Sequence, residues 1–295
     1  MHTFDYQKVY RLQDAFNMAS ASKGASVYVA GGTDVLVQIK EGKIRPQSVI
    51  DVKGVSEMEG FGISGDEFSI GALTSMRTLE TSPSVREKVP LLCQAASKLG
   101  SVQVRTRATI GGNLCNASPS AETAPALLAL DAQAVIFGKT GMRAVDLSEF
   151  FLGPGATVLG DGEILARLRI PLTRKRQGSV YYKLSTRKAM DLAFVGVAVL
   201  LEVDGDDRIT KARIALGAVA PTPIRVLSAE KLVEDGRLSP GAARESAERA
   251  AQSCNPISDL RASAEYRRDM VRELCYQGLL TAYVQAKDFP EGQNE

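Results

Sequence analysis

The sequence predicts an α+β fold made of two or three compact units. Its 295 residues are 44% hydrophobic and 24% charged, which is enough apolar sequence for a core in each unit. Up to Pro171, short strand-like and helix-like segments follow one another. Beyond it, three β-rich stretches are followed by mainly helical sequence, which predicts a separate layer of strands covered by helices.

Glycine and proline divide the first part of the chain into short elements. Gly31-Gly32 ends a strand, and Thr33-Asp34 can cap the helix that follows. Pro90 is expected to interrupt a helical stretch or begin a turn, whereas Pro125 suits the first turn of an apolar helix. The expected helices are Leu12–Ser22, Val35–Lys40, Ser84–Leu99 and Ala124–Leu130, and the expected strands are Ser26–Ala30, Val49–Val52, Glu67–Ala72, Ala134–Phe137 and Ile164–Ile170.

The second part is expected to begin near Pro171–Gly178, a segment rich in Arg and Lys and closed by glycine. Asp204–Asp207 carries the turn residues of a β-hairpin. A long helix is expected over Ala264–Ala286. The strands are expected at Val180–Ser185, Phe194–Val203 and Lys211–Val219, and the core-facing residues of the long helix are expected to be Tyr266, Met270, Val271, Leu274, Cys275 and Leu279.

Charge and hydropathy exclude two classes of partner. The formal net charge is +2 with both signs scattered, so no basic surface for nucleic acid is expected. The longest apolar stretches, such as Ala193–Leu201, are shorter than the roughly 20 residues that span a bilayer. The first residues lack the pattern of a signal peptide. We therefore expect a cytoplasmic protein with no membrane span and no nucleic-acid partner.

The histidine and cysteine content limits the chemistry. His2 is the only histidine, so neither a Ser–His–Asp triad nor an HExxH metal motif can be built. The four cysteines, at positions 93, 115, 254 and 275, form no CxxC pair, and we expect buried free thiols and no metal site. Reactivity must therefore come from a bound cofactor or from Lys, Tyr and carboxylate side chains.

Two glycine pairs are candidates for binding a diphosphate. In Tyr28–Val35, a strand ends in Gly31-Gly32 and a helix follows, so backbone N–H groups can approach an anion closely. Asp34 would be repelled by a phosphate, and we expect it to cap the helix or to reach a ribose hydroxyl. In the second element, Gly111-Gly112 lies among the donor side chains Thr109, Asn113, Asn116 and Ser118. The alternative is an ordinary turn whose glycines serve only backbone geometry.

Glu122 begins the apolar helix that follows the second glycine pair. One interpretation is a first-turn carboxylate favoured by the helix dipole. The other is an acceptor for a hydrogen bond from a bound ribose or flavin group. The spacing of the glycines matches neither GxGxxG nor the Walker A motif, so the standard NAD-binding and P-loop folds are disfavoured.

The order of these motifs resembles the FAD-binding subunit of molybdenum hydroxylases, a family that includes the medium subunit of aerobic carbon monoxide dehydrogenase and the flavin domain of xanthine dehydrogenase. The resemblance is carried by Ala30–Asp34, Thr109–Asn113, Ala117–Pro119 and Ala124–Leu130. It continues through Glu163–Leu165, Ile170-Pro171, Tyr182-Lys183, Arg187, Asp191–Ala193 and Ser263–Arg267.

The resemblance implies an α+β fold with a two-subdomain, PCMH-like FAD-binding domain over residues 1–175, divided into about 1–52 and 53–175. A C-terminal domain of antiparallel strands plus helices is implied over residues 176–290. The implied FAD-binding residues are Tyr28, Val29, Ala30, Gly31, Gly32, Thr33, Asp34, Val35, Leu99, Gly100, Thr109, Ile110, Gly111, Gly112, Asn113, Ser118, Glu122, Leu165 and Lys183.

Two of these positions carry a specific expectation. Glu122 stands where the family usually has aspartate. Lys183 matches a residue near the isoalloxazine ring, whereas its pattern alone predicts an exposed lysine on a strand.

The function that the resemblance implies is electron transfer within a heterotrimer. A large subunit with the molybdenum cofactor oxidises the substrate, and a small iron–sulfur subunit passes electrons to FAD in this chain. An external acceptor, such as NAD+ or a quinone, then takes the electrons. Two alternatives stay open: a stand-alone flavin-dependent oxidoreductase with its own substrate site, and a non-catalytic nucleotide-binding scaffold.

Overall fold

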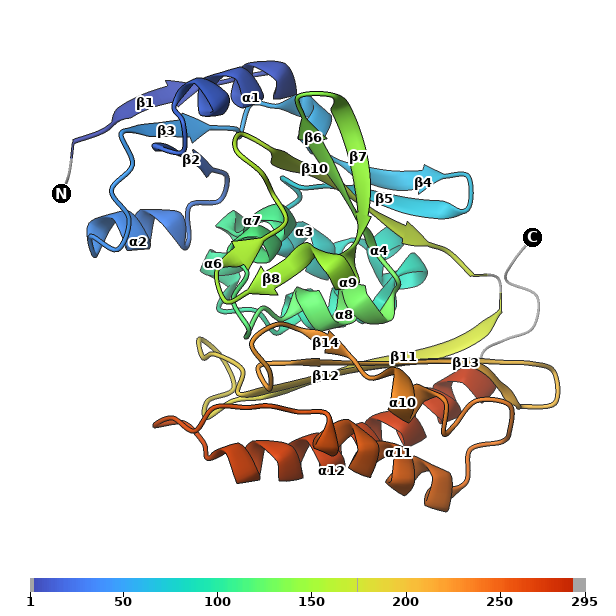
Figure 1. The fold of residues 1–295 in the computed structure, drawn as a ribbon. Helices are drawn as coiled ribbons and strands as arrows, with labels where there is room; N and C mark the ends of the chain where they lie inside the picture. The colour runs from blue at the N-terminus through green and yellow to red at the C-terminus, as the bar shows by residue number, and fades with distance from the viewer. Residues whose placement is uncertain (1–2, 174, 289–295) are drawn as a thin grey trace.

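The computed structural model describes residues 3–173 and 175–288, so His2 lies outside the described residues. The N-terminal unit is a small parallel sheet of order β1-β3-β2, formed by β1 (Asp5–Lys8), β3 (Ser48–Asp51) and β2 (Ser26–Val29). Two helices connect its strands, α1 (Leu12–Ala21) and α2 (Val35–Lys40). This unit forms the blue end of the molecule in Figure 1.

The second sheet is antiparallel and is joined to a group of short helices. Its order is β4-β5-β10-β6-β7, from β4 (Phe61–Ser64), β5 (Glu67–Gly71), β10 (Ile164–Pro171), β6 (Gln133–Gly138) and β7 (Gly141–Asp146). The helices and small elements are η1 (Ser56–Met58), α3 (Met76–Thr81), α4 (Pro83–Lys88), α5 (Pro90–Ser97), α6 (Val102–Arg107), α7 (Ile110–Cys115), α8 (Thr123–Ala129), α9 (Leu147–Phe150), β8 (Phe151–Gly153) and β9 (Ala156–Thr157).

The C-terminal unit is an antiparallel sheet of order β11-β12-β13-β14, with long helices beneath it in Figure 1. Its strands are β11 (Arg176–Leu184), β12 (Val195–Val203), β13 (Ile209–Gly217) and β14 (Ile224–Arg225). Its helices are α10 (Leu227–Glu230), α11 (Pro240–Gln252) and α12 (Ala264–Lys287). The hairpin predicted at Asp204–Asp207 is confirmed, because β12 and β13 pair antiparallel across it.

Both faces of the C-terminal sheet are covered, which explains why every residue of β12 is buried. Alternate residues such as Val197 and Val199 belong to the core that contains α11 and α12. Ala198 and Leu200 point the other way and belong to the core that contains α5 and α8. The sheet is therefore the layer through which the C-terminal unit is joined to the preceding part of the chain.

Most elements expected from the sequence are present, and the differences have local causes. Ser84–Leu99 is two helices, because Pro90 begins α5 after Val89 has left the helical conformation. Tyr266 is 45% exposed and does not belong to the core face of α12, which instead buries Arg267. The additional elements include β1, β7, α6 and α11, whose exposed or alanine-rich sequences give weak hydrophobic patterns.

None of the helices within residues 3–173 and 175–288 is long and apolar enough to cross a membrane. The division of the chain at residues 52 and 175 stays a prediction. The passage between the second and third sheets runs from the end of β10 at Pro171 to the start of β11 at Arg176.

Candidate functional site

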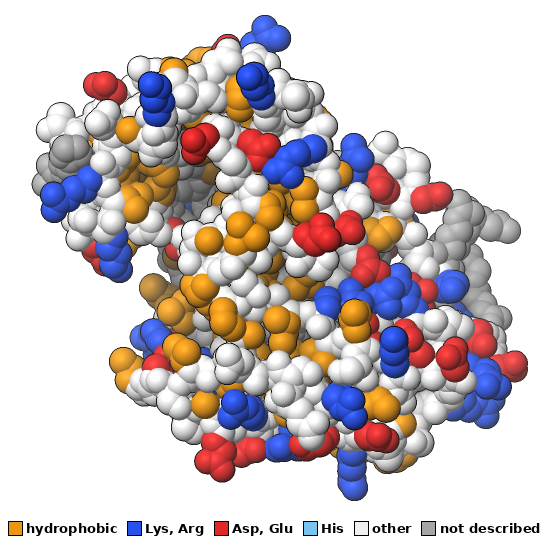
Figure 2. Space-filling view, viewed as in Figure 1, with side chains coloured by type: hydrophobic (Ala, Val, Ile, Leu, Met, Phe, Trp, Pro, Cys, Tyr) orange, Lys and Arg blue, Asp and Glu red, His pale blue; other side chains and the backbone are white. Residues whose placement is uncertain are grey.

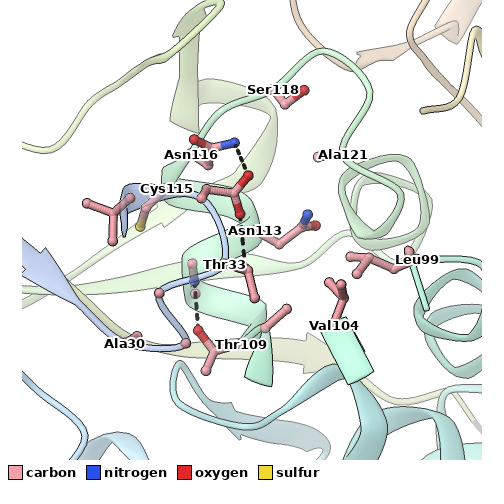
Figure 3. Close-up of a pocket in the computed structure, with 18 of the residues that line it drawn as sticks. Ala30, Thr33, Leu99, Val104, Thr109, Asn113, Cys115, Asn116, Ser118 and Ala121 are labelled. Atoms are coloured by element: carbon pink, nitrogen blue, oxygen red, sulfur yellow. Dashed lines mark hydrogen bonds between the residues drawn. The ribbon is translucent and has the colours of Figure 1, made fainter. Parts of the chain in front are cut away.

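A cavity of about 720 Å³ lies where the N-terminal unit meets the second and third sheets. Figure 2 shows the molecule notched at the left, where the N-terminal unit overhangs the rest. Residues from both glycine elements line the cavity, and Figure 3 shows Thr33, Thr109, Asn113 and Asn116 around it. A volume of this size falls within the range of small-molecule and cofactor pockets, which is roughly 300–1,000 Å³.

The first glycine element carries unpaired backbone donors on residues that line the cavity. After β2 ends at Val29, Gly32 takes a φ of +77°, which glycine adopts without strain. In the described part of the chain, the N–H groups of Gly32, Thr33 and Asp34 have no acceptor. Three consecutive free donors make a concave site for an anion. This element therefore has the properties expected of a phosphate-binding bend.

Asp34 does not cap helix α2 with its side chain. Its backbone already has αR torsion angles, whereas a capping residue usually has extended ones. The carboxylate accepts hydrogen bonds from Thr33 Oγ1 at 3.2 Å and from Asn116 Nδ2 at 3.4 Å. Of the two expectations for Asp34, the side-chain cap was wrong, and the contact with a ribose hydroxyl stays a prediction. Its carboxylate instead joins the two glycine elements.

The second glycine element differs from the first, because its backbone donors are already used. Its glycines lie inside the first turn of α7, with Thr109 as the capping residue. Ile110 N–H donates to the Thr74 carbonyl at 3.0 Å, Gly111 N–H to the Ala72 carbonyl at 2.9 Å, and Gly112 N–H to Thr109 Oγ1 at 3.1 Å. The second element can therefore hold a ligand through side chains and close backbone approach, but not through these three N–H groups.

Three of the four glycines, Gly31, Gly111 and Gly112, differ in what an added side chain would meet. A Cβ on Gly31 would collide with the Arg107 carbonyl, and one on Gly111 would lie 2.7 Å from the Ala72 Cβ. Gly112 is exposed, and a Cβ there would meet only Thr109 Oγ1, at 3.0 Å. Two of these glycines are thus required by packing of the chain against itself, as the alternative interpretation held, whereas Gly112 leaves space on the cavity side.

The two glycine elements lie side by side. Gly31 packs against the backbone of Arg107 and Ala108, which leads directly into Thr109. Asn116, just beyond α7, donates to Asp34 and accepts a hydrogen bond from Gln38 Nε2 at 3.1 Å. Asp34 and Asn116 are 82 residues apart in the sequence, yet the two bends form one wall of the cavity, as the dashed contact at Asn116 in Figure 3 illustrates.

Glu122 lines the cavity and forms a buried ion pair with Lys183, whose pattern alone predicted an exposed side chain. Lys183 Nζ donates to Glu122 Oε1 at 2.8 Å, to the Lys98 carbonyl at 2.9 Å and to the Asp191 carbonyl at 2.7 Å. Burial raises the pKa of the Glu122 carboxyl, and the positive charge of Lys183 opposes that shift. All three ammonium protons are therefore used. Through these hydrogen bonds, Lys183 connects the segments that contain Lys98, Glu122 and Asp191.

The remaining predicted residues divide between the cavity and its surroundings. Leu99, Gly100 and Leu165 form part of the apolar lining, and Ser118 also lines the cavity. Val29, Ile110 and Lys183 are buried behind the lining residues. Many lining residues were not among the implied binding residues, and they include Val104, Ala121, Glu163, Arg187 and Asp191. Three of these, Glu163, Arg187 and Asp191, lie in motifs that carried the resemblance, which was the available signal.

The charges around the cavity fit a dinucleotide held mainly by backbone groups. Its lining includes the carboxylates Asp34, Glu122, Glu163 and Asp191, and the cations Arg187 and Arg261. Within residues 3–173 and 175–288 there is no group of three or more His, Cys, Asp or Glu side chains that could hold a metal ion. The free donors of the first bend, the open space at Gly112 and the apolar surface around Leu99 and Leu165 together suit a ligand with a phosphate centre and flat apolar rings.

Comparison with known proteins identifies the family. Residues 2–173 match the model of the FAD binding domain in molybdopterin dehydrogenase, and residues 180–282 match that of the CO dehydrogenase flavoprotein C-terminal domain. The chain is 33% identical over 276 residues to the xanthine dehydrogenase FAD-binding subunit of Escherichia coli O157:H7, covering 92% of this chain and 94% of that protein. It is 31% identical over 280 residues to the carbon monoxide dehydrogenase medium chain of Hydrogenophaga pseudoflava, covering 95% and 97%.

The fold agrees with these matches. A solved carbon monoxide dehydrogenase from Hydrogenophaga pseudoflava, in a form that lacks the Mo-pyranopterin moiety of its cofactor, superposes with a TM-score of 0.93 at 30% identity, covering 96% of this chain and 98% of that one. The cavity, its free backbone donors and these matches lead to one conclusion: the chain belongs to the family of FAD-binding oxidoreductase subunits of the xanthine and carbon monoxide dehydrogenase type.

Proposed function

We propose that this chain is the electron-transfer subunit of a multi-subunit molybdenum hydroxylase and that it holds FAD in the cavity between its two glycine elements. The observation that carries the proposal is the single cavity wall formed by Gly31–Asp34 and Thr109–Asn113. Full-length similarity to a carbon monoxide dehydrogenase medium chain supports the assignment to a complex. The partners would be a large molybdenum-cofactor subunit and a small iron–sulfur subunit.

The residues of this chain would bind and orient the cofactor. The free N–H groups of Gly32, Thr33 and Asp34 would hold the diphosphate, and Gly112 would allow it to approach α7 closely. Leu99 and Leu165 would contact the rings and exclude water from them. Glu122, fixed by Lys183, would accept a hydrogen bond from a ribose or flavin group with its remaining oxygen capacity.

When bound, FAD supplies the electron-accepting and electron-donating chemistry, which this chain's side chains do not provide themselves. Electrons would enter from the iron–sulfur centres of the small subunit and leave to an external acceptor such as NAD+ or a quinone. The described residues offer a wall of apolar and backbone groups around the cavity, with Arg187 and Arg261 as its only lining cations. This arrangement suits a subunit that positions a cofactor.

The proposal is tested by purifying the chain with its natural partners and recording its absorption spectrum and metal content. We expect an oxidised-flavin spectrum that bleaches with dithionite, with molybdenum and iron in the same complex. A colourless chain that does not rebind added FAD would overturn the cofactor assignment. Turnover of an organic donor by the isolated, flavin-loaded chain would instead support the stand-alone oxidoreductase.

A further inference from the structure

The α2 segment, defined here as residues 30–44, is weakly attached to the rest of the molecule. Helix α2 buries only Ile39, which packs with Val29 and Val49 in a small core of its own. Leu36 and Val37 on the same helix are 39% and 47% exposed. The segment nevertheless carries the three free N–H groups, on residues that line the cavity. Its position therefore decides whether the phosphate-binding bend is formed.

Asn116 makes the side-chain connection between this segment and the second glycine element. Its Nδ2 donates to Asp34 Oδ1 at 3.4 Å, and its Oδ1 accepts from Gln38 Nε2 at 3.1 Å. In the described part of the chain, these are the only hydrogen bonds between residues 30–44 and the rest of the molecule. Asn116 follows α7 directly, and its own N–H is bonded to the Gly112 carbonyl at 3.0 Å, so it is held by the second glycine element.

The contact with Asp34 also has an electrostatic consequence. Asp34 is the carboxylate nearest in sequence to the free donors, and a phosphate there would be repelled by it. The hydrogen bond from the Asn116 amide fixes the orientation of the Asp34 carboxylate, and so the position of its negative charge. Asn supplies both the donor for Asp34 and the acceptor for Gln38, which neither Asp nor Ala can do.

We propose that Asn116 is a positioning residue that latches the α2 segment onto the second glycine element and so holds the first bend ready for the diphosphate of FAD. This proposal rests on the proposed function, because it describes how the same cavity is closed. Both polar atoms of the Asn116 side chain are hydrogen-bonded within the protein. Asn116 therefore contributes to FAD binding by holding Asp34 and Gln38 in place. Both hydrogen bonds join protein atoms only, so their loss should be visible in the FAD-free protein as well as in the loaded one.

The test compares the rate at which FAD leaves the full-length wild-type chain with the rate for variants. Asn116→Ala should raise that rate about tenfold, because two hydrogen bonds that order the segment are lost. Asn116→Asp should raise it further, because two carboxylates then face each other, and high salt should reduce the excess. Gln133→Ala, which removes an exposed hydrogen bond to Asp146 between residues that do not line the cavity, serves as the matched control and should leave the rate unchanged.

A double variant that exchanges the residues at positions 34 and 116 should restore slow release of FAD. In Asp34→Asn with Asn116→Asp, the amide and the carboxylate change places, so the bond to residue 34 and the acceptor for Gln38 are both restored. We expect the double variant to release FAD within about threefold of the wild-type rate. Failure of the rescue, with the double variant as fast as Asn116→Asp, would overturn the latch.

Hydrogen exchange in the FAD-free full-length protein separates positioning from direct contact with the cofactor. Amides of Val35–Lys40 should exchange faster in Asn116→Ala than in the wild type, and those of β12 should not change. Faster FAD release without faster exchange in α2 would show a direct ligand contact and overturn the proposal. A wild-type chain that binds no FAD would refute the proposed function itself, whereas wild-type and Asn116→Ala chains with equal release rates would refute only the latch.

Discussion

At the scale of single residues, similar sequence motifs have different physical roles. Gly31 and Gly111 are glycines because the backbone of residues 107 and 72 lies where a Cβ would be. Gly112 has no such neighbour and is exposed toward the cavity. The two diglycine pairs look alike in the sequence, yet only at Gly112 does the missing side chain leave room for a ligand.

This difference predicts opposite results for neighbouring substitutions. Gly112→Val should fold with nearly wild-type stability and lose FAD binding, because the branched side chain fills space on the cavity side. Gly111→Val should lower the free energy of unfolding by roughly 1–3 kcal/mol or more, because it overlaps Ala72. Thermal unfolding and flavin absorbance of the two purified variants provide the measurement. Full flavin occupancy in Gly112→Val would remove the second glycine element from the binding site.

At the scale of elements, close packing fixes how α12 lies on the C-terminal sheet. Gly178 in β11 faces α12 so closely that a Cβ would collide with the Ala282 carbonyl and lie 2.6 Å from the Ala286 N atom. Gly278 in α12 in turn lies against Val199 of β12. Small residues on both elements allow the backbones to approach, and the helix covers one face of β12 along its length.

Gly178→Ala should therefore destabilise the protein by about 1–3 kcal/mol, because neither the strand nor the helix backbone can move aside cheaply. Gly205→Ala is the matched control, since an added Cβ in that turn has no neighbour within 4 Å. Urea denaturation of both variants gives the comparison. Equal stability of the two variants would show that α12 shifts freely on the sheet.

At the scale of the whole molecule, a charge cluster joins the C-terminal sheet to α8. Asp131, just after α8, accepts from Lys211 at 2.9 Å, from Arg213 at 3.0 Å and from Arg225 at 2.7 Å. Arg225 also donates to the Leu128 carbonyl at 3.0 Å. Burial raises the pKa of Asp131, but the hydrogen bonds from Lys211 and Arg225 and the charge of Arg213 outweigh it, and the pKa is lowered.

The lowered pKa fixes the direction of a pH effect. The stabilisation by Asp131 is fully present above its ordinary pKa of 3.8 and is lost as the pH falls through the lower value in the folded protein. Asp131→Asn should cost about 1–2 kcal/mol at neutral pH and should flatten the loss of stability below pH 3.8. Glu87→Gln, at an exposed side chain, is the control. The measurement is the free energy of unfolding at a series of pH values from 7 downward. Equal values for Asp131→Asn and the wild type at every pH would contradict this role.

The sequence by itself determined the fold class, the order of most elements and the family. These follow from local patterns: the β-rich run that becomes β12, the glycine pairs and the prolines that begin helices. Most of the binding residues that the resemblance implied also line the cavity, because the motifs that carry the resemblance are contiguous in the chain.

Only the tertiary structure decided which of those residues have polar groups available to bind a ligand. The donors of Gly111 and Gly112 are used by Ala72 and Thr109, Lys183 is buried by contacts with three separate segments, and Asn116 joins two bends that are distant in the sequence. The physical reason is that the hydrogen-bond partners and close neighbours of these residues come from distant parts of the chain. A local sequence pattern does not determine which distant residues will be in contact.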